Sequence, residues 1–102
     1  MSTTVTDNAE RNRYEVHGGG ELAGFADYHK TDDHVLVFTH TQVDPRWEGQ
    51  GVGSTLIRWA LDDARRQGVK VLPICPFVQT WMARHPDYED LDFRAPYGKP
   101  AD

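Results

Sequence analysis

Hydrophobic and polar residues alternate along the first half of the chain, as half-buried β-strands require. Residues 11–30, RNRYEVHGGGELAGFADYHK, contain two such runs joined by three consecutive glycines, which readily adopt the positive φ angles of a hairpin turn. A third run, HVLVFTHTQV at 34–43, is rich in branched and aromatic side chains and ends before Asp44-Pro45. These three segments predict an antiparallel β-meander.

The second half of the chain begins with a helical pattern. Between residues 54 and 67 apolar side chains recur three and four positions apart, charged side chains lie mostly opposite them, and Gly68 follows as a stop signal. VKVLPIC at 69–75 predicts a short strand, and PFVQTWMARH at 76–85 predicts a second helix that begins at Pro76. The predicted fold class is α/β, a β-meander followed by a β-α-β-α unit whose helices cover the sheet.

The length of 102 residues suits one small domain with a single core. We expect residues 11–93 to form it, and the polar segments 1–10 and 94–102 to be poorly ordered tails. Sixteen acidic residues outnumber eleven basic ones, so the formal net charge is −5. This balance argues against nucleic acid or an anionic membrane surface as a partner, because both bind basic faces.

The expected location is the cytoplasm. The N-terminal segment MSTTVTDNAE lacks the charged and apolar regions of a signal peptide, and no apolar run is long enough to span a membrane. Cys75 is the single cysteine, so no internal disulfide can form, which agrees with a reducing compartment.

Three glycines at alternate positions, Gly49, Gly51 and Gly53, directly precede the first predicted helix. A helix N-terminus offers unpaired amide donors, and glycines before it let an anion approach without meeting a Cβ atom. The spacing is neither that of a nucleoside triphosphatase loop nor that of a dinucleotide-binding loop. A turn without a ligand is the alternative, but the strand-loop-helix-strand context favours an anionic ligand.

The segment from His40 to Tyr88, including DPRWEGQGVGS and ICPF, resembles the small single-domain acetyltransferase-like group of the GNAT superfamily (the Yjdj-type N-acetyltransferase domain). The resemblance implies a minimal GNAT-like fold and acetyl-coenzyme A as co-substrate. It also implies that backbone amides of the loop bind the pyrophosphate, and that the strand before the loop gives backbone to the pantetheine arm. The implied binding residues are Val43, Gly49, Gln50, Gly51, Val52, Gly53 and Ser54.

One position departs from the superfamily pattern, in which the loop begins with Arg or Gln. The matching residue is Glu48, and an acidic side chain facing a pyrophosphate is unfavourable. We therefore expect Glu48 to point away from the ligand, with Arg46 or Arg58 offsetting its charge. Pro73, near the end of the second strand of the unit, removes a ladder hydrogen bond and predicts weakened pairing there. In the superfamily the pantetheine arm enters between these two strands.

Cys75 and His40 are the candidate catalytic residues. Cys75 directly precedes a predicted helix, where the dipole favours a thiolate, although a cysteine ending a buried strand is as easily a small core residue. His40 could accept a proton from an incoming amine or from Cys75, or could be a histidine satisfied within the sheet. The other histidines show no metal-ligand spacing, so we expect no metal site.

The acceptor side of the reaction is less defined. Larger superfamily members use a tyrosine near the last helix as general acid, but that helix carries Trp81 and Met82 here, and the sequence does not place Tyr88 in the site. Helical spacing predicts core or interface positions for Trp59, Phe77 and Trp81. Further strands that bind the acceptor in larger members have no counterpart in this sequence.

The favoured function is an acetyl-coenzyme A-dependent N-acetyltransferase that acts on an amine, either directly or through Cys75. An open site suits a small-molecule amine such as a polyamine, or an exposed protein lysine. The alternatives are a coenzyme A-binding module that acts through a protein partner without efficient catalysis, and an interaction domain without a ligand. No feature of the sequence specifies an oligomeric state.

Overall fold

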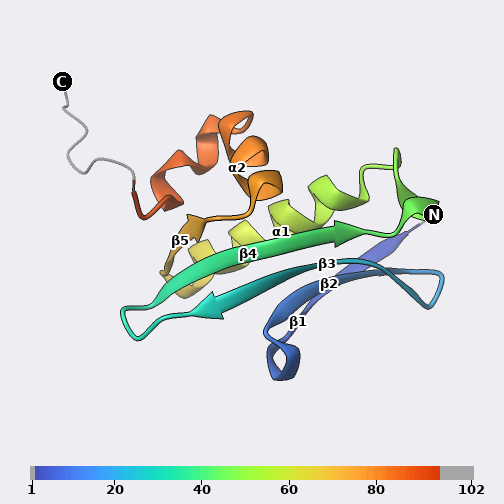
Figure 1. Ribbon diagram of the computed structural model, residues 1–102, viewed down its shortest axis with the longest axis horizontal. Coiled ribbons are helices and arrows are strands. Elements are labelled where there is room, and N and C mark those ends of the chain that lie inside the picture. The colour runs from blue at the N-terminus through green and yellow to red at the C-terminus, as the bar shows by residue number, and fades with distance from the viewer. Residues whose placement is uncertain (1, 95–102) are drawn as a thin grey trace.

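The computed structural model describes residues 2–94 and shows a five-stranded sheet with two helices on one of its faces (Figure 1). The strands lie in the order β1-β2-β3-β4-β5, antiparallel except for the parallel pair β4 and β5. Three short 3-10 helices complete the described chain. The elements are β1 Thr3–Asn8, η1 Ala9–Arg11, β2 Arg13–Gly18, β3 Glu21–Lys30, β4 Val35–Val43, η2 Pro45–Trp47, α1 Val52–Gln67, β5 Lys70–Pro73, α2 Pro76–Ala83 and η3 Pro86–Leu91.

The predicted meander and β-α-β-α unit are confirmed. The hairpin between β2 and β3 turns through Gly19 and Gly20, both with positive φ. Helix α1 begins at Val52, two residues before the predicted start, and Gly68 follows it in the left-handed conformation. Helix α2 is shorter than predicted, because it ends at Ala83 and the chain continues into η3.

The N-terminal segment differs from the prediction. Residues 1–10 were expected to be a poorly ordered tail, but Thr3–Asn8 form β1 and pair with β2 along the whole strand. The run TTVT is β-branched and suits a strand, and its one apolar residue, Val5, is buried opposite Val16. A single buried side chain is too weak a pattern for sequence periodicity to detect. Residues 95–102 of the expected C-terminal tail lie outside the described residues.

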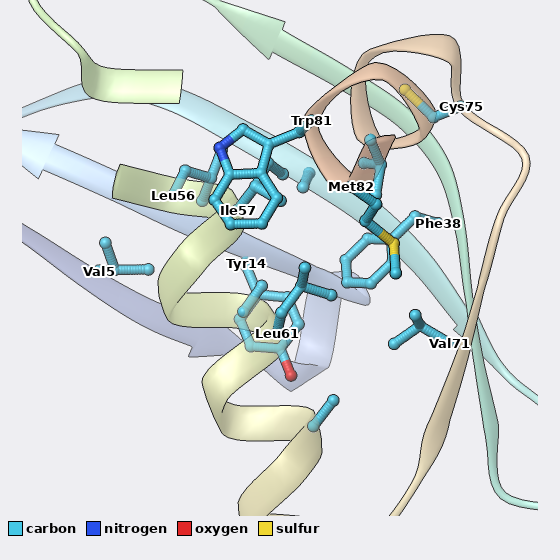
Figure 2. Close-up of a cluster of buried hydrophobic side chains, with 14 of the residues drawn as sticks. Val5, Tyr14, Phe38, Leu56, Ile57, Leu61, Val71, Cys75, Trp81 and Met82 are labelled. Carbon is cyan, nitrogen blue, oxygen red and sulfur yellow. The ribbon is translucent and has the colours of Figure 1, made fainter. Parts of the chain in front are cut away.

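The core lies between the sheet and the two helices (Figure 2). The apolar face of α1 is fully buried, and α2 adds Val78, Trp81 and Met82. Tyr14 and Phe38 contribute the largest buried rings of the strands, and the Tyr14 hydroxyl donates a hydrogen bond to Asp63 of α1 at 2.9 Å. No helix within residues 2–94 is long and apolar enough to cross a membrane.

The two faces of the sheet differ in what covers them. The covered face, which α1 and α2 pack against, carries Tyr14, Val16, Ala26, Phe38, Thr41 and Val43. The open face carries Arg13, Glu15, Phe25, Asp27, His40 and Gln42. Residues paired directly across neighbouring strands share a face, so Thr41 lies with buried Ala26 and His40 lies with Asp27.

Candidate active site

A glycine loop connects β4 to α1 and leaves amide donors unused at the start of the helix. Gly49 and Gly51 have φ angles of 81° and 75°, which strain any residue with a side chain. The Thr55 N–H donates the first helical hydrogen bond, to the Gly51 carbonyl at 3.0 Å. The three N–H groups before it therefore have no acceptor within the helix. They belong to Val52, Gly53 and Ser54.

A pocket with a volume of about 290 Å³ opens beside this loop. It is bounded on one side by Val43 at the end of β4 and on the other by Phe77 of α2. All but one of the predicted binding residues line it, namely Val43, Gly49, Gly51, Val52, Gly53 and Ser54. The exception is Gln50, whose side-chain amide instead donates a hydrogen bond to the Arg46 carbonyl at 3.3 Å.

Packing against Phe77 and Val43 explains why residue 53 is a glycine. A Cβ atom at this position would lie 2.6 Å from Cζ of Phe77 and 3.3 Å from Cγ2 of Val43. Gly53 therefore lets the Phe77 ring pack directly against the first turn of α1. By contrast, a Cβ atom on Gly49 or Gly51 would meet no protein atom within 4 Å, so the space beside these two residues is open to a ligand.

The expected compensation of Glu48 is not present. Glu48 borders the pocket. Arg46 instead pairs with Asp44 at 3.0 Å and with Glu21 at 3.5 Å, and its hydrogen bonds lower the pKa of Asp44. Arg58 lies over the Trp81 ring at 5.3 Å and donates a hydrogen bond to the Tyr88 hydroxyl at 3.3 Å. The expectation that either arginine offsets Glu48 is therefore wrong for this structure.

Strands β4 and β5 separate next to the loop, where Pro73 predicted weakened pairing. Their last paired residues are Phe38 and Pro73, and the Phe38 carbonyl then accepts hydrogen bonds from the N–H groups of Ile74 and Cys75, both at 3.0 Å. The register between β3 and β4 also shifts at this point, which places a β-bulge at Thr39. Residues 39–43 of β4 thus have no β5 partner, and the gap beside them leads toward the glycine loop.

Cys75 stands at the edge of this gap, on the covered side. It is the N-cap residue of α2, and its side chain is 4% exposed. Its thiol donates a hydrogen bond to Oγ1 of Thr41 at 3.4 Å, from the unpaired part of β4. Figure 2 shows the Cys75 sulfur at the start of α2, beside the core cluster.

His40 lies on the other side of the sheet from Cys75. Its side chain is exposed on the open face, with Nε2 at 3.4 Å from Oε1 of Gln42 and its ring 6.0 Å from that of Phe25. Consecutive residues of a strand point to opposite faces, so Thr41 reaches the thiol and His40 does not. The hypothesis that His40 takes a proton from Cys75 is therefore not supported by this arrangement.

A second pocket lies in the groove between α1 and α2 and has a volume of about 570 Å³. It shares Ser54 and Phe77 with the glycine-loop pocket, so the two adjoin. Sequence reasoning did not predict this groove. Helical spacing predicted Phe77 as a core or interface residue. It is 41% exposed between the two pockets and does not belong to the core cluster, so the core half of this prediction is wrong.

Trp81 forms the floor of this groove. Its indole N–H donates a hydrogen bond to Oγ of Ser54 at 2.8 Å, and the ring of His85 stacks on it with centroids 3.7 Å apart. Trp81 is 6% exposed and belongs to the core, as its helical spacing predicted.

Tyr88 is engaged away from both pockets. Its hydroxyl donates a hydrogen bond to Oδ1 of Asp62 at 2.7 Å, and burial together with this bond raises its pKa. The side chain of Tyr88 therefore links η3 to α1. Within residues 2–94, no group of three or more histidine, cysteine, aspartate or glutamate residues could hold a metal ion.

The family model of GCN5-related N-acetyltransferases matches residues 13–91, from β2 through η3. The chain belongs to this family. The resemblance noted in the glycine loop and in ICPF is thereby confirmed.

Several solved structures share this fold. A GCN5-like protein from Staphylococcus aureus superposes with a TM-score of 0.71 at 19% identity, and the match covers 97% of this chain and 96% of that one. N-acetylglutamate synthase from Neisseria gonorrhoeae, complexed with coenzyme A and N-acetyl-glutamate, superposes with a TM-score of 0.59 at 20% identity. That match covers 72% of this chain and 18% of the synthase.

Among curated proteins, a probable sucrose-phosphate synthase 1 from Craterostigma plantagineum is 34% identical over 56 residues. The match covers 53% of this chain but 5% of the length of that protein. It therefore concerns a short segment of a much longer chain.

Proposed function

We propose that this protein is an acetyl-coenzyme A-dependent N-acetyltransferase that transfers an acetyl group to an amine. The observation that carries the proposal is the juxtaposition of the glycine-loop pocket with the gap between β4 and β5. Membership in the GCN5-related family and the coenzyme A complex of the N. gonorrhoeae neighbour support the choice of donor.

The residues of the loop fit the pyrophosphate of the donor. The amides of Val52, Gly53 and Ser54 have no helical acceptor, and the open space beside Gly49 and Gly51 admits an anion. Backbone groups of β4 near Val43, without a β5 partner, fit the amide groups of a pantetheine arm. Bound there, acetyl-coenzyme A would supply an activated thioester at the gap.

The two faces of the sheet support direct transfer. The pocket and Cys75 lie on the covered side of β4, whereas His40 lies on the open side. An amine that approaches from the open face would meet His40 first. His40 would accept the ammonium proton through an imidazole nitrogen, so that the neutral amine attacks the thioester carbonyl. The C–S bond then breaks, and the proton that the new amide nitrogen loses protonates the departing coenzyme thiolate.

A covalent route through Cys75 is the second candidate, because the thiol borders the same gap. The Cys75 thiol would give its proton to the coenzyme sulfur that it displaces, and an acetyl-cysteine would form. The neutral amine would then displace the Cys75 sulfur, and the proton lost by the amide nitrogen would restore the thiol. The thiol must first break its hydrogen bond to Thr41 and become exposed. The covalent route therefore requires a rearrangement that direct transfer does not.

The proposed acceptor is a polyamine or an exposed protein lysine, and the proposed location is the cytoplasm. The open face of the sheet has no helix over it in the described chain, so a bulky acceptor can reach His40 (Figure 1). A single free cysteine suits the reducing cytoplasm.

Calorimetric titration with acetyl-coenzyme A tests the donor site, with Gly51→Val as the variant and Gly20→Val as its control. Both glycines have nearly the same φ, 75° and 80°, and a Cβ on either meets no protein atom, so backbone strain is matched. We expect Gly51→Val to abolish binding and Gly20→Val to preserve it.

Binding by wild-type protein must be followed by turnover with an amine panel. Saturable binding with acetyl transfer supports the proposal. Binding without transfer to any amine would instead identify a coenzyme A-binding module. Absence of binding would rule out the glycine loop as a donor site.

A further inference from the structure

Asp27 of β3 is a half-buried carboxylate on the open face of the sheet. Within residues 2–94 its side chain accepts no hydrogen bond and forms no ion pair, and the other acidic side chains that lack both are exposed. Burial of a charge costs free energy unless a cation or a hydrogen-bond donor faces it. Asp27 is therefore suited to bind a cation that the described chain does not itself supply.

The cation opposite Asp27 on the neighbouring strand is engaged elsewhere. Arg13 pairs with Asp27 in the register of β2 and β3, so the two side chains share the open face. However, Nε of Arg13 lies 2.7 Å from Oε2 of Glu15, and its Cζ lies 4.6 Å from the centroid of the Phe25 ring. Arg13 thus neutralises Glu15 and leaves the charge of Asp27 uncompensated.

Asp27 also lies beside the proposed general base. His40 is its partner in the register of β3 and β4, and the bulge at Thr39 leaves two residues of β4 opposite Asp27. Oγ1 of Thr39 donates a hydrogen bond to the Asp27 carbonyl at 3.5 Å, which links the bulge to β3. Nε2 of His40 faces Oε1 of Gln42, 3.4 Å away along its own strand. The Asp27 carboxylate is therefore available to a group of the acceptor that lies next to His40.

The order of the strands sets the shape of such an acceptor. The β4–β5 gap, where the thioester would lie, is on one side of β4, and Asp27 on β3 is on the other. Neighbouring strands are about 4.8 Å apart, so the gap and Asp27 are separated by one to two strand spacings, roughly 5–10 Å. A short acceptor that spans this interval places one amine at the gap and a second group at Asp27.

We infer that Asp27 is a specificity-determining residue that binds the second ammonium group of a diamine or polyamine acceptor, while the amine at the other end reacts by direct transfer beside His40. This inference rests on the proposed function, because it requires acetyl transfer at the gap. An ammonium group donates charge-assisted hydrogen bonds to a carboxylate, and the formal net charge of −5 favours a cationic acceptor.

The test compares putrescine with n-butylamine, which has the same carbon chain but a single amine, as acceptors at saturating acetyl-coenzyme A and low ionic strength. For wild-type protein we expect kcat/KM to be about 10-fold higher for putrescine, as for a charge-assisted hydrogen bond. Asp27→Asn should lower the putrescine value by about the same factor, mainly through KM, and leave n-butylamine unchanged. Asp27→Glu keeps the carboxylate and should retain part of the preference.

Asp33→Asn is the matched control, because it removes the same charge from an exposed carboxylate in the turn before β4. It should keep the wild-type preference, and the same loss in this variant would overturn the role of Asp27. Equal losses with both amines in Asp27→Asn would also overturn it, since Asp27 would then act through His40. Transfer to both amines at equal kcat/KM by wild-type protein would overturn the inference alone, whereas no transfer to either would overturn the proposed function with it.

Discussion

The covered face and the open face of the same sheet carry different kinds of side chain. On the covered face Tyr14, Val16 and Phe38 are at most 1% exposed beneath the helices. On the open face the corresponding positions hold polar groups, among them Glu15 and exposed His40. The first face supplies the apolar burial that stabilises the fold, while the second is free to present reactive groups.

Strand β4 shows how the two faces meet at the site. As far as Phe38 it pairs on both edges, and beyond Phe38 it pairs with β3 alone. In this unpaired part, His40 and Thr41 are adjacent in sequence but point to opposite faces. Under the proposed function, the covered face of this unpaired part would contact the acetyl donor and the open face would contact the amine acceptor.

The largest effect should follow from Phe38→Ala, which opens a cavity on the covered face. Phe38 is fully buried in the core, so we expect the free energy of unfolding to fall by about 3–5 kcal/mol, as measured by urea denaturation. Phe25→Ala removes the same ring from the open face, where it is half-buried. A loss from Phe25→Ala as large as that from Phe38→Ala would contradict the division between the faces.

The next effect should come from His40→Gln, which changes activity instead of stability. Loss of a general base should lower kcat by about 100-fold, whereas an exposed substitution should change the free energy of unfolding by less than about 0.5 kcal/mol. Steady-state kinetics and thermal melts measure the two quantities. His29→Gln, also exposed and on β3, is the control and should leave both unchanged.

A smaller effect is expected from Cys75→Ala if transfer is direct. The thiol lies on the covered side, away from His40, so we expect kcat to fall by less than about 10-fold, equivalent to ~1.4 kcal/mol. Steady-state kinetics with Cys75→Ser as a second variant checks this. A loss that matches His40→Gln, together with an acetylated Cys75 in mass spectra of wild-type protein, would instead establish the covalent route.

The sequence predicted the parts of the fold in which local pattern and tertiary burial agree. The apolar spacing in α1 defined its buried face, and glycines marked both the β2–β3 turn and the end of the helix. The glycine loop and Pro73 also predicted the pocket and the strand gap, because backbone conformation there depends on residue type.

The remaining features depend on contacts between distant segments. The side of the sheet on which His40 lies depends on the bulge at Thr39, which sequence periodicity does not reveal. The α1–α2 groove depends on the packing of Phe77 against Gly53, 24 positions earlier in the numbering. Similarly, Gly18 admits the buried Trp47, since a Cβ there would lie 2.5 Å from the indole ring.

The smallest effect concerns Glu15, a sheltered carboxylate on the open face. Burial raises the pKa of Glu15, but hydrogen bonds from Arg13 at 2.7 Å and Asn8 at 3.1 Å outweigh it, so the pKa is lowered from 4.5. A lowered pKa means that the ionised group stabilises the fold above pH 4.5, and that this contribution is lost as the pH falls through the folded-state pKa.

Glu15→Gln should therefore destabilise the protein at pH 7 by about 0.5–1 kcal/mol, and the difference from wild type should vanish as the medium becomes more acidic than the folded-state pKa. Urea denaturation between neutral and acidic pH measures this trend. Glu10→Gln, an exposed carboxylate in η1, is the control for the change in net charge. The same pH trend in both variants would show that general charge repulsion, and not the Arg13–Glu15 pair, stabilises the open face.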